Sequence, residues 1–159
     1  GFYPDRTRCN CLPGDISRYL KRISGPLLDR IDICTEISPV EYGELTGKRE
    51  NESSEAIRSR VLAAHRRQQE RYQKVGIQFN SQLTTRVIQN LCPLGTEETG
   101  IMEQAFESLR LSARGYYRII RVARTIADLE GSKEIRTPHL LEAVGYRTMD
   151  HNIWEEPFG

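Results

Sequence analysis

Residues 111–132, LSARGYYRIIRVARTIADLEGS, decide the fold class. Apolar residues recur in this stretch at the three- and four-residue spacing of an amphipathic helix. Ser112 stands where an N-cap is preferred, and Gly131 stands where helices commonly end in a left-handed residue. The stretch therefore predicts a long helix from Ser112 to Gly131. Its expected inner face consists of Tyr116, Ile119, Ile120, Ala123, Ile126 and Ala127.

Helical patterns also flank this stretch on both sides. Ser53 or its neighbour is expected to cap a helix that reaches about Lys74. Two further helices are expected over about 81–91 and 96–110, and Thr137-Pro138 predicts the start of another that reaches about Val144. These segments predict a subdomain of four to five packed helices. The expected inner face of the first helix is Ile57, Val61, Ala64 and Tyr72.

Residues 14–37 follow a different pattern. DISRYLKRIS predicts a short helix, Gly25-Pro26 ends it, and IDICTEI (31–37) alternates apolar and polar residues as a strand does. A single strand cannot satisfy its backbone hydrogen bonds alone, and the neighbouring sequence offers it no partner. We therefore expect a helix and one strand left from a sheet-containing core, and a chain that is a C-terminal fragment of a larger protein.

The expected organisation has four parts and is mainly α. Residues 1–40 are the remnant of the core, and residues 41–52 are a linker marked by glycines and mixed charges. Residues 53–147 are the helical subdomain, and residues 148–159 are a polar tail that we expect to be poorly ordered unless it docks.

The composition of the 159-residue chain excludes several classes of protein. Lys and Arg total 23 against 22 Asp and Glu, so a uniformly basic nucleic-acid-binding protein is excluded and only a local basic face remains open. No run approaches the roughly 18 apolar residues that span a membrane, and no signal peptide is expected. The four cysteines are too sparse for a disulfide scaffold, so we expect a reducing cytoplasm. No complete familiar nucleotide-binding or catalytic motif is present.

Arg30 is the first candidate functional residue. It follows Gly25-Pro26 and two leucines that are able to anchor a turn, and it directly precedes the predicted strand. A rigidly held guanidinium suits bidentate contact with a phosphate. The alternative is an ordinary salt bridge to Asp29 or Asp32.

Arg114 is the second candidate. It lies in the first turn of the long predicted helix, where backbone N–H groups favour an anion. Arg118 and Arg121 follow in the same stripe, and stacked like charges repel unless acidic side chains or a phosphate lie opposite. The alternative is a solvated basic face.

A further basic helix and a cysteine pair are weaker candidates. The helix over 53–74 carries six positive charges against two negative ones; it suits either nucleic acid or an acidic neighbour in the same protein, and we favour the neighbour. Cys9 and Cys11 form half of a zinc ligand set, but Cys34 and Cys92 are too far away in the sequence to complete it. His65, His139 and His151 are expected to be structural or solvent-facing.

Three segments together resemble one family. ISGPLLDRIDI (23–33), SSEAIRSRV (53–61) and residues 111–132 are similar to the C-terminal part of ComM/YifB-type proteins, which are magnesium chelatase-related ATPases of the AAA+ class. The resemblance runs from about Cys9 to Arg147, nearly the whole chain. It implies a helical AAA+ lid, preceded by the end of an α/β ATPase core.

The resemblance also implies roles for both arginines. Arg30 matches the arginine finger, and Arg114 matches the sensor-2 arginine that contacts the γ-phosphate of ATP, either in its own subunit or in a neighbouring one. It implies a ring, usually hexameric, with ATP and Mg²⁺ between subunits. The motifs that hold the phosphates and Mg²⁺ would precede Gly1, so this chain is not expected to hydrolyse ATP alone. In the family a second cysteine pair would complete a zinc site with Cys9 and Cys11.

Three functions remain open at this stage. A ComM-like protein would couple ATP hydrolysis to DNA branch migration, with branched or single-stranded DNA as its partner. A chelatase-like ATPase would instead remodel a protein partner. A helical protein-interaction module would need neither arginine for nucleotide turnover.

Overall fold

The computed structural model describes residues 8–35, 37, 40, 42–43 and 51–154, excluding the side chains of 148–154. Within these residues the chain is mainly helical and contains no strand, so the predicted fold class is confirmed. The helices are α1 (Pro13–Leu20), α2 (Gly25–Leu28), α4 (Ser54–Tyr72), the 3₁₀ turn η1 (Asn80–Gln82), α5 (Thr85–Leu91), α6 (Thr96–Ser108), α7 (Ala113–Glu130) and α8 (Thr137–Trp154).

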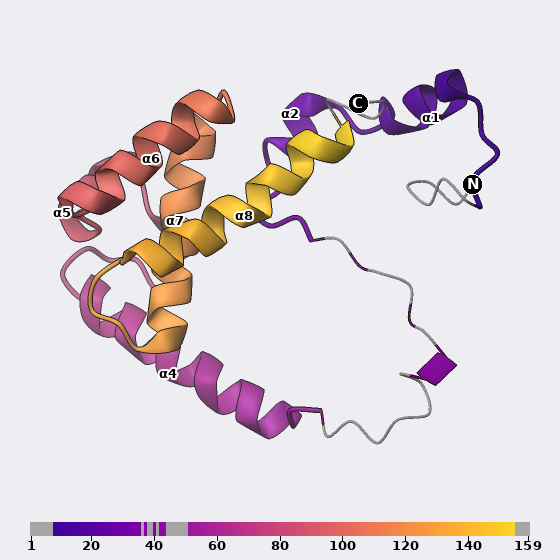
Figure 1. Cartoon of the computed structure of the whole chain (residues 1–159). Coiled ribbons are helices and arrows are strands. Elements are labelled where there is room, and N and C mark those ends of the chain that lie inside the picture. The colour runs from indigo at the N-terminus through magenta and orange to yellow at the C-terminus, as the bar shows by residue number, and fades with distance from the viewer. Residues whose placement is uncertain (1–7, 36, 38–39, 41, 44–50, 155–159) are drawn as a thin grey trace.

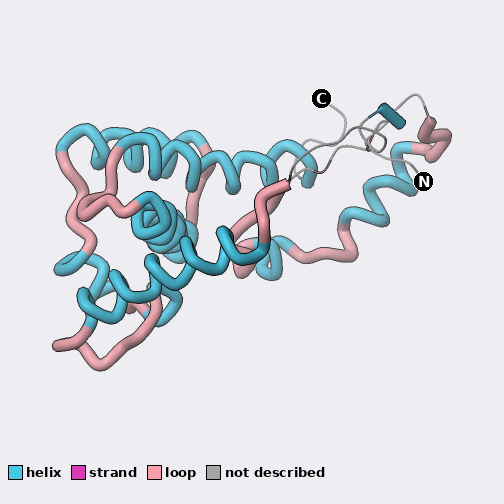
Figure 2. The backbone as a smooth tube through the Cα atoms, turned by 90° about the horizontal axis from the view of Figure 1, so that it is seen from below, coloured by secondary structure: helices cyan, strands magenta, loops and turns pink. Residues whose placement is uncertain are grey.

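Helix α7 lies at the centre of the helical bundle. It packs against α8 and α4, and it also contacts α5 and η1, while α6 packs against α8 (Figure 1). Helices α1 and α2 lie apart from α4, α5 and α6, toward the C-terminal half of α8 (Figures 1 and 2). Helices α4 to α8 therefore pack together as a bundle, and α2 lies near the C-terminal half of α8.

Side-chain caps fix where the bundle helices begin. Ser53 accepts from the Ala56 N–H at 3.2 Å, Thr84 from the Val87 N–H at 3.4 Å, and Ser112 from the Gly115 N–H at 3.0 Å. Gly131 ends α7 with φ of 88°, a left-handed conformation that suits glycine. The predicted bounds of α7 are therefore confirmed at both ends.

The hydrophobic core is built between α4, α5, α6, α7 and α8. Neither α1 nor α2 contributes to it. Leu20 is the only buried residue of these two helices, and it is not a member of the core cluster. Small residues on α7 allow close helix packing around larger apolar side chains. The core cluster consists of Tyr72, Leu83, Ile88, Cys92, Met102, Ile119, Ile120, Ala123, Ile135, Leu140 and Ala143.

The predicted strand over 31–37 is wrong for its described residues, 31–35 and 37. Alternation of apolar and polar residues makes a strand only when another strand accepts its backbone hydrogen bonds. Here a backbone bond to another element joins the Cys34 N–H to the Tyr146 carbonyl of α8 at 3.4 Å, and no described residue of the segment pairs with a strand. The segment is consequently irregular, and Ile33 and Ile37 remain exposed.

Other boundaries also differ from the sequence predictions. Helix α8 continues ten residues past Val144 to Trp154, through residues expected to form a polar tail. The segment predicted as one helix over 81–91 is the turn η1 followed by α5. Most of the linker predicted over 41–52 lies outside the described residues.

The inner face predicted for α4 is only half covered. Ala64 and Tyr72 are buried against the bundle, whereas Ile57 is 42% exposed and Val61 is 38% exposed. The first turns of α4 extend beyond the rest of the bundle (Figure 1).

Candidate functional site

Arg30 lies just after α2, on an exposed turn. Helix α2 is a single turn that Pro26 opens, and the N–H of Arg30 bonds to the Leu27 carbonyl at 2.9 Å. The Arg30 side chain is exposed, and its guanidinium is 3.5 Å from the Pro26 carbonyl. Within the described part of the chain it forms no ion pair, which argues against the ordinary salt bridge to Asp29 or Asp32.

Arg114 lies in the first turn of α7, as predicted. Its side chain is exposed, and no carboxylate of the described residues forms an ion pair with it. The helix N-terminus adds a partial positive charge at this place. Arg114 is therefore a cation whose charge is not neutralised by the described residues.

The segment over 28–32 attaches Arg30 to the same end of α7. The Ser112 hydroxyl donates to the Asp29 carboxylate at 3.2 Å. Arg118 donates to the Asp29 carbonyl, and its Nε lies 2.9 Å from the Asp32 carboxylate. Both candidate arginines therefore come from segments joined at the N-terminal end of α7.

Helix α8 supplies a second attachment. Arg147 donates to the Ile31 carbonyl at 2.8 Å and to the Leu28 carbonyl at 3.4 Å. Its other nitrogen lies 3.4 Å from the Asp29 carboxylate. The Arg147 side chain is only 10% exposed, so these bonds form largely away from water.

The three arginines of the predicted stripe on α7 have different environments. Arg114 is unpaired among the described residues, and Arg118 is paired with Asp32. Burial lowers the pKa of Arg118, while the charge of Asp32 acts in the opposite direction. Arg121 lines a cavity of about 300 Å³ together with Ile33 and Tyr146, and its buried Nε has no hydrogen-bond partner. An acidic partner therefore balances one of the three charges, as one alternative expected.

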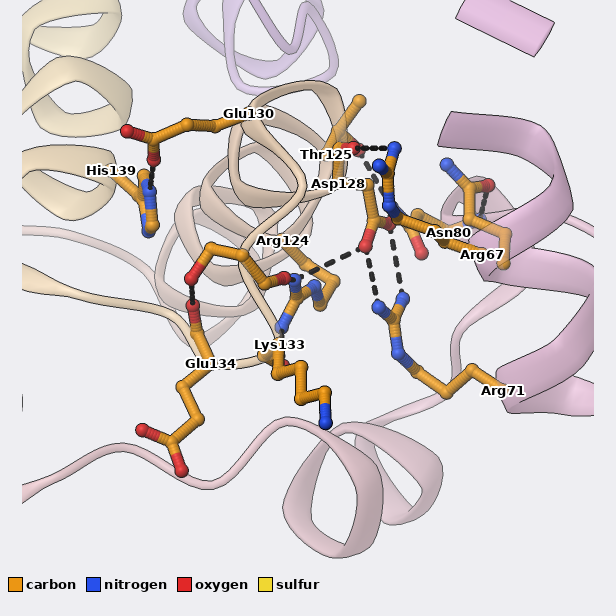
Figure 3. Close-up of polar contacts among 12 residues, drawn as sticks. Arg67, Arg71, Asn80, Arg124, Thr125, Asp128, Glu130, Lys133, Glu134 and His139 are labelled. Carbon is orange, nitrogen blue, oxygen red and sulfur yellow. Dashed lines mark hydrogen bonds and ion pairs between the residues drawn. The ribbon is translucent and has the colours of Figure 1, made fainter. Parts of the chain in front are cut away.

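Asp128 organises a buried polar cluster at the other end of α7 (Figure 3). Its carboxylate is fully buried and accepts two bonds from Arg71, at 3.0 and 2.5 Å. It also accepts one bond from Asn80 at 2.9 Å and lies 3.1 Å from Arg124. Arg67 donates to the Asp128 carbonyl at 3.0 Å. This cluster joins α4 to α7 and was not identified from the sequence.

Burial and hydrogen bonding act in opposite directions on the arginines of this cluster. Burial acts to lower the pKa of Arg71, but hydrogen bonds to Asp128 and Tyr72 outweigh it and raise that pKa. Burial lowers the pKa of Arg124, and the Asp128 charge again opposes the effect. Arg124 also donates to the Ser132 and Lys133 carbonyls, at 2.7 and 2.9 Å, and so holds the turn after α7.

Acidic side chains balance part of the basic character of α4, as the interpretation that we favoured expected. Arg71 pairs with Asp128, and Arg60 pairs with Glu52 at 2.7 Å. Arg58, Arg66 and Lys74 remain exposed.

His139 is structural, as expected. It is 3% exposed, its Nδ1 accepts from the Arg136 N–H at 2.9 Å, and its Nε2 contacts Glu130. The side chain therefore fastens the start of α8 to the end of α7.

The described residues offer no complete metal site. Cys9 and Cys11 form no disulfide, and the side-chain hydrogen bond between them raises the pKa of Cys11. No group of three or more His, Cys, Asp or Glu side chains gathers around a possible ion in the part that the structure describes. No helix of that part is long and apolar enough to cross a membrane. The half zinc site at Cys9 and Cys11 stays a prediction.

The chain belongs to the magnesium chelatase ChlI family. The family profile described as "Magnesium chelatase, subunit ChlI C-terminal" matches residues 51–147, and the one described as "Magnesium chelatase, subunit ChlI" matches residues 1–45. The mainly helical fold is consistent with the helical lid of a AAA+ ATPase.

Particular relatives confirm the resemblance to ComM and YifB. Competence protein ComM of Haemophilus influenzae is 43% identical over 139 residues, which cover 86% of this chain and 26% of that protein. The uncharacterized protein YifB of Salmonella typhimurium is 42% identical, and that of Escherichia coli 40%, each over 141 residues that cover 88% of this chain and 27% of the relative. The chain spans about a quarter of the length of these curated relatives.

Proposed function

We propose that this chain is the C-terminal lid part of a AAA+ ATPase in which Arg30 is the arginine finger and Arg114 is sensor 2. The observation that carries the proposal is the attachment of the Arg30 turn to the N-terminal end of α7, where Arg114 also lies. In this assignment residues 1–40 end the ATPase core, 41–52 link it to the lid, 53–147 form the lid and 148–159 form the tail.

The chemistry of both arginines suits the γ-phosphate of ATP. As the bond to the leaving group breaks, negative charge develops on the phosphoryl oxygens, and a guanidinium placed there lowers the barrier. In GTPases an arginine finger raises the rate of hydrolysis by a factor of about 10³–10⁵. Exposed guanidinium groups without carboxylate partners are able to meet such an anion without first breaking an ion pair.

The residues described do not fit Mg²⁺, because they bring no carboxylate cluster together. Ligands for Mg²⁺ and the amides that hold the other phosphates are assigned to the nucleotide-binding core of the full-length protein. In this proposal ATP and Mg²⁺ are cofactors of the full-length protein. This chain contributes only the two arginines that contact the γ-phosphate.

We place both arginines at a boundary between subunits of a ring, hexameric in this proposal. An arginine finger acts on the nucleotide of a neighbouring subunit. Because the Arg30 turn is bound to the helix that carries Arg114, the two side chains are expected to reach the same nucleotide, so that sensor 2 also acts from the neighbouring subunit.

For the substrate of the motor we propose DNA. A ComM relative that is named a competence protein supports a role in handling incoming DNA, in which ATP hydrolysis drives branch migration as a helicase does. Arg58 and Arg66 on α4 and Lys74 just after it are exposed and supply a basic surface for phosphates. The second candidate, remodelling of a protein partner, is favoured by the name of the matched family.

The first test is the ATPase activity of the full-length protein with and without branched DNA. Strong stimulation supports the DNA motor, whereas ATPase indifferent to DNA favours the chelatase-like function. The Arg30→Ala variant is expected to lose hydrolysis while nucleotide binding is largely kept. Collapse of binding with unchanged hydrolysis per bound nucleotide contradicts the finger assignment.

Arg114→Ala tests sensor 2 separately. The variant is expected to lose more affinity for ATP than for ADP, because only ATP carries the γ-phosphate. Equal losses contradict the assignment. Arg86→Ala is the matched control, since Arg86 is exposed on α5, and it is expected to behave as the wild type. An interaction module would keep full nucleotide turnover in all three variants.

A further inference from the structure

The turn that carries Arg30 has little structure of its own. Helix α2 is four residues long and contains no buried residue. The backbone N–H groups of Asp29, Arg30 and Ile31 make local bonds, such as that of Ile31 to the Leu28 carbonyl at 2.9 Å. The strand expected after Arg30 is absent from the described residues. The orientation of Arg30 must therefore be set by groups from other elements.

Arg118 of α7 holds the backbone on both sides of Arg30. Its Nη1 donates to the Asp29 carbonyl and lies 3.5 Å from the Ile31 carbonyl. Its Nε binds the Asp32 carboxylate at 2.9 Å, and the side chain is only 12% exposed. One guanidinium thus contacts the residue before Arg30, the residue after it and the next one.

Arg147 of α8 holds the same backbone from a second helix. It donates to the Ile31 and Leu28 carbonyls, and its Nη2 lies near the Asp29 carboxylate. The Ile31 carbonyl is therefore approached by both arginines. Two guanidinium groups this close repel each other, and the carboxylates of Asp29 and Asp32 offset that repulsion.

These contacts require the shape of arginine. A guanidinium presents five N–H donors in a fixed planar fork, whereas a lysine ammonium is a single point of charge. Lysine at position 118 would keep the charge but would not reach two carbonyls and a carboxylate together. Arg→Lys is thus a substitution that separates geometry from charge.

We propose that Arg118 and Arg147 are positioning residues for Arg30, which hold the finger turn on α7 and α8 so that Arg30 and Arg114 move as one unit. The inference deepens the proposed function and rests on it. Arg114 precedes Arg118 by one helical turn, so a movement of α7 on phosphate binding is carried directly to the Asp29 and Ile31 carbonyls. Phosphate contact at sensor 2 thereby sets the position of the finger.

The first experiment is a double-mutant cycle on the ATPase activity of the full-length protein. Arg118→Lys is expected to lower kcat by about 10²-fold, the cost of a small misplacement of a catalytic group, with little change in ATP affinity. In the Arg30→Ala background the same substitution should have no further effect, because the group that it positions is gone. Equal losses in both backgrounds overturn the proposal.

The second experiment measures the turn itself, in the 159-residue chain. Backbone ¹⁵N order parameters at Arg30 and Ile31 are expected to fall from about 0.85 toward 0.6 in Arg118→Lys and in Arg147→Lys. Amides of α4 and the C-terminal half of α7 should not change, and Arg86→Lys is the control. Unchanged order parameters at Arg30 and Ile31 overturn the proposal.

The two experiments separate two failures. If the turn loosens as expected but Arg30→Ala leaves ATP hydrolysis intact, the finger assignment is wrong and the attachment is structural only. If Arg30→Ala abolishes hydrolysis but neither lysine variant affects the turn or kcat, the finger stands and the positioning role is wrong. Should Arg118→Lys fail to fold, Arg147→Lys carries the same tests.

Discussion

Replacing Asp128 by Asn should strongly destabilise the helical bundle. The carboxylate is fully buried and is bound by Arg71, Arg124 and Asn80. Asparagine keeps the shape but removes the charge and turns an NH₂ group toward these donors. The two guanidinium groups then remain buried beside a neutral partner.

The magnitude follows from what is left unpaired. Removing one partner of a buried ion pair costs about 3–5 kcal/mol. Arg71 is 17% exposed, so water relieves part of the loss, and Arg124 keeps the Ser132 and Lys133 carbonyls as acceptors. Both facts favour the lower end, about 3 kcal/mol, which is a substantial fraction of a typical unfolding free energy of about 5–15 kcal/mol.

Urea unfolding of the 159-residue chain, followed by circular dichroism, measures the effect. With a slope of about 1–3 kcal/mol per M, the loss lowers the midpoint by about 1–3 M. The matched control is Asp15→Asn, because Asp15 pairs with Arg18 at 3.1 Å on the surface, where such a pair contributes at most about 1 kcal/mol. If Asp128→Asn lowers the urea midpoint by no more than Asp15→Asn does, the reasoning is refuted.

A second cycle isolates the contact between α4 and α7. Arg71→Gln alone leaves Asp128 with Arg124 and Asn80, so its cost should be smaller than that of Asp128→Asn. Adding Arg71→Gln to Asp128→Asn should cost little more, because the pair is already broken. Full additivity would mean that Arg71 stabilises the bundle through contacts other than the ion pair.

Three further predictions concern single positions. Gly131→Ala should destabilise the bundle by about 1–2 kcal/mol in urea unfolding, since φ is 88° there and a Cβ would lie 3.0 Å from Arg67. The pKa of Glu98 is lowered, first by its own backbone N–H and also by Thr137, so its stabilising effect is present above its ordinary pKa of 4.5 and is lost as the pH falls through the lower folded value. The pKa values of Cys11 and Cys92 are both raised, but Cys92 is buried and Cys11 is exposed, so iodoacetamide at pH 8 should alkylate Cys11 and spare Cys92 until urea unfolds the chain.

Each of these has its own control. Gly100→Ala should stabilise α6 by about 0.5–1 kcal/mol, because a Cβ at position 100 meets no atom within 4 Å; a loss there would count against the packing argument for Gly131. Glu98→Gln should flatten the decline of the urea midpoint below pH 4.5, and an unchanged decline would assign it to other carboxylates. Rapid alkylation of native Cys92 would contradict its burial at 4% exposure.

Local sequence signals predicted the long helix well and the first segment poorly. Ser112 and Gly131 act within one helical turn of their own position, so the bounds of α7 were readable without any tertiary contact. The alternation in IDICTEI is also a local signal, but a strand exists only through a partner, and the described residues provide none. The extension of α8 beyond Val144 lacked a visible stop signal and a visible apolar stripe.

In the candidate site, too, some residues were predictable from the sequence and others were not. Arg30 and Arg114 were selected from motifs, and their exposure agrees with that selection, but their roles remain proposals. Arg118 and Arg147, 29 residues apart, had no shared motif to connect them with each other or with Asp29. For the basic helix α4, net charge indicated an acidic neighbour, but the identity of Asp128 required the fold.

The sequence by itself determined the family, the mainly helical class and the ends of the helices with strong caps, because these depend on residues that are neighbours in the chain. Tertiary structure alone decided which charges are neutralised. Arg71 and Asp128 lie 57 residues apart, and Arg118 reaches a carbonyl 89 residues away. Whether a charge is paired, buried or free depends on atoms brought together only when the helices pack, and that physical condition leaves Arg30 and Arg114 unpaired in the described part of the protein.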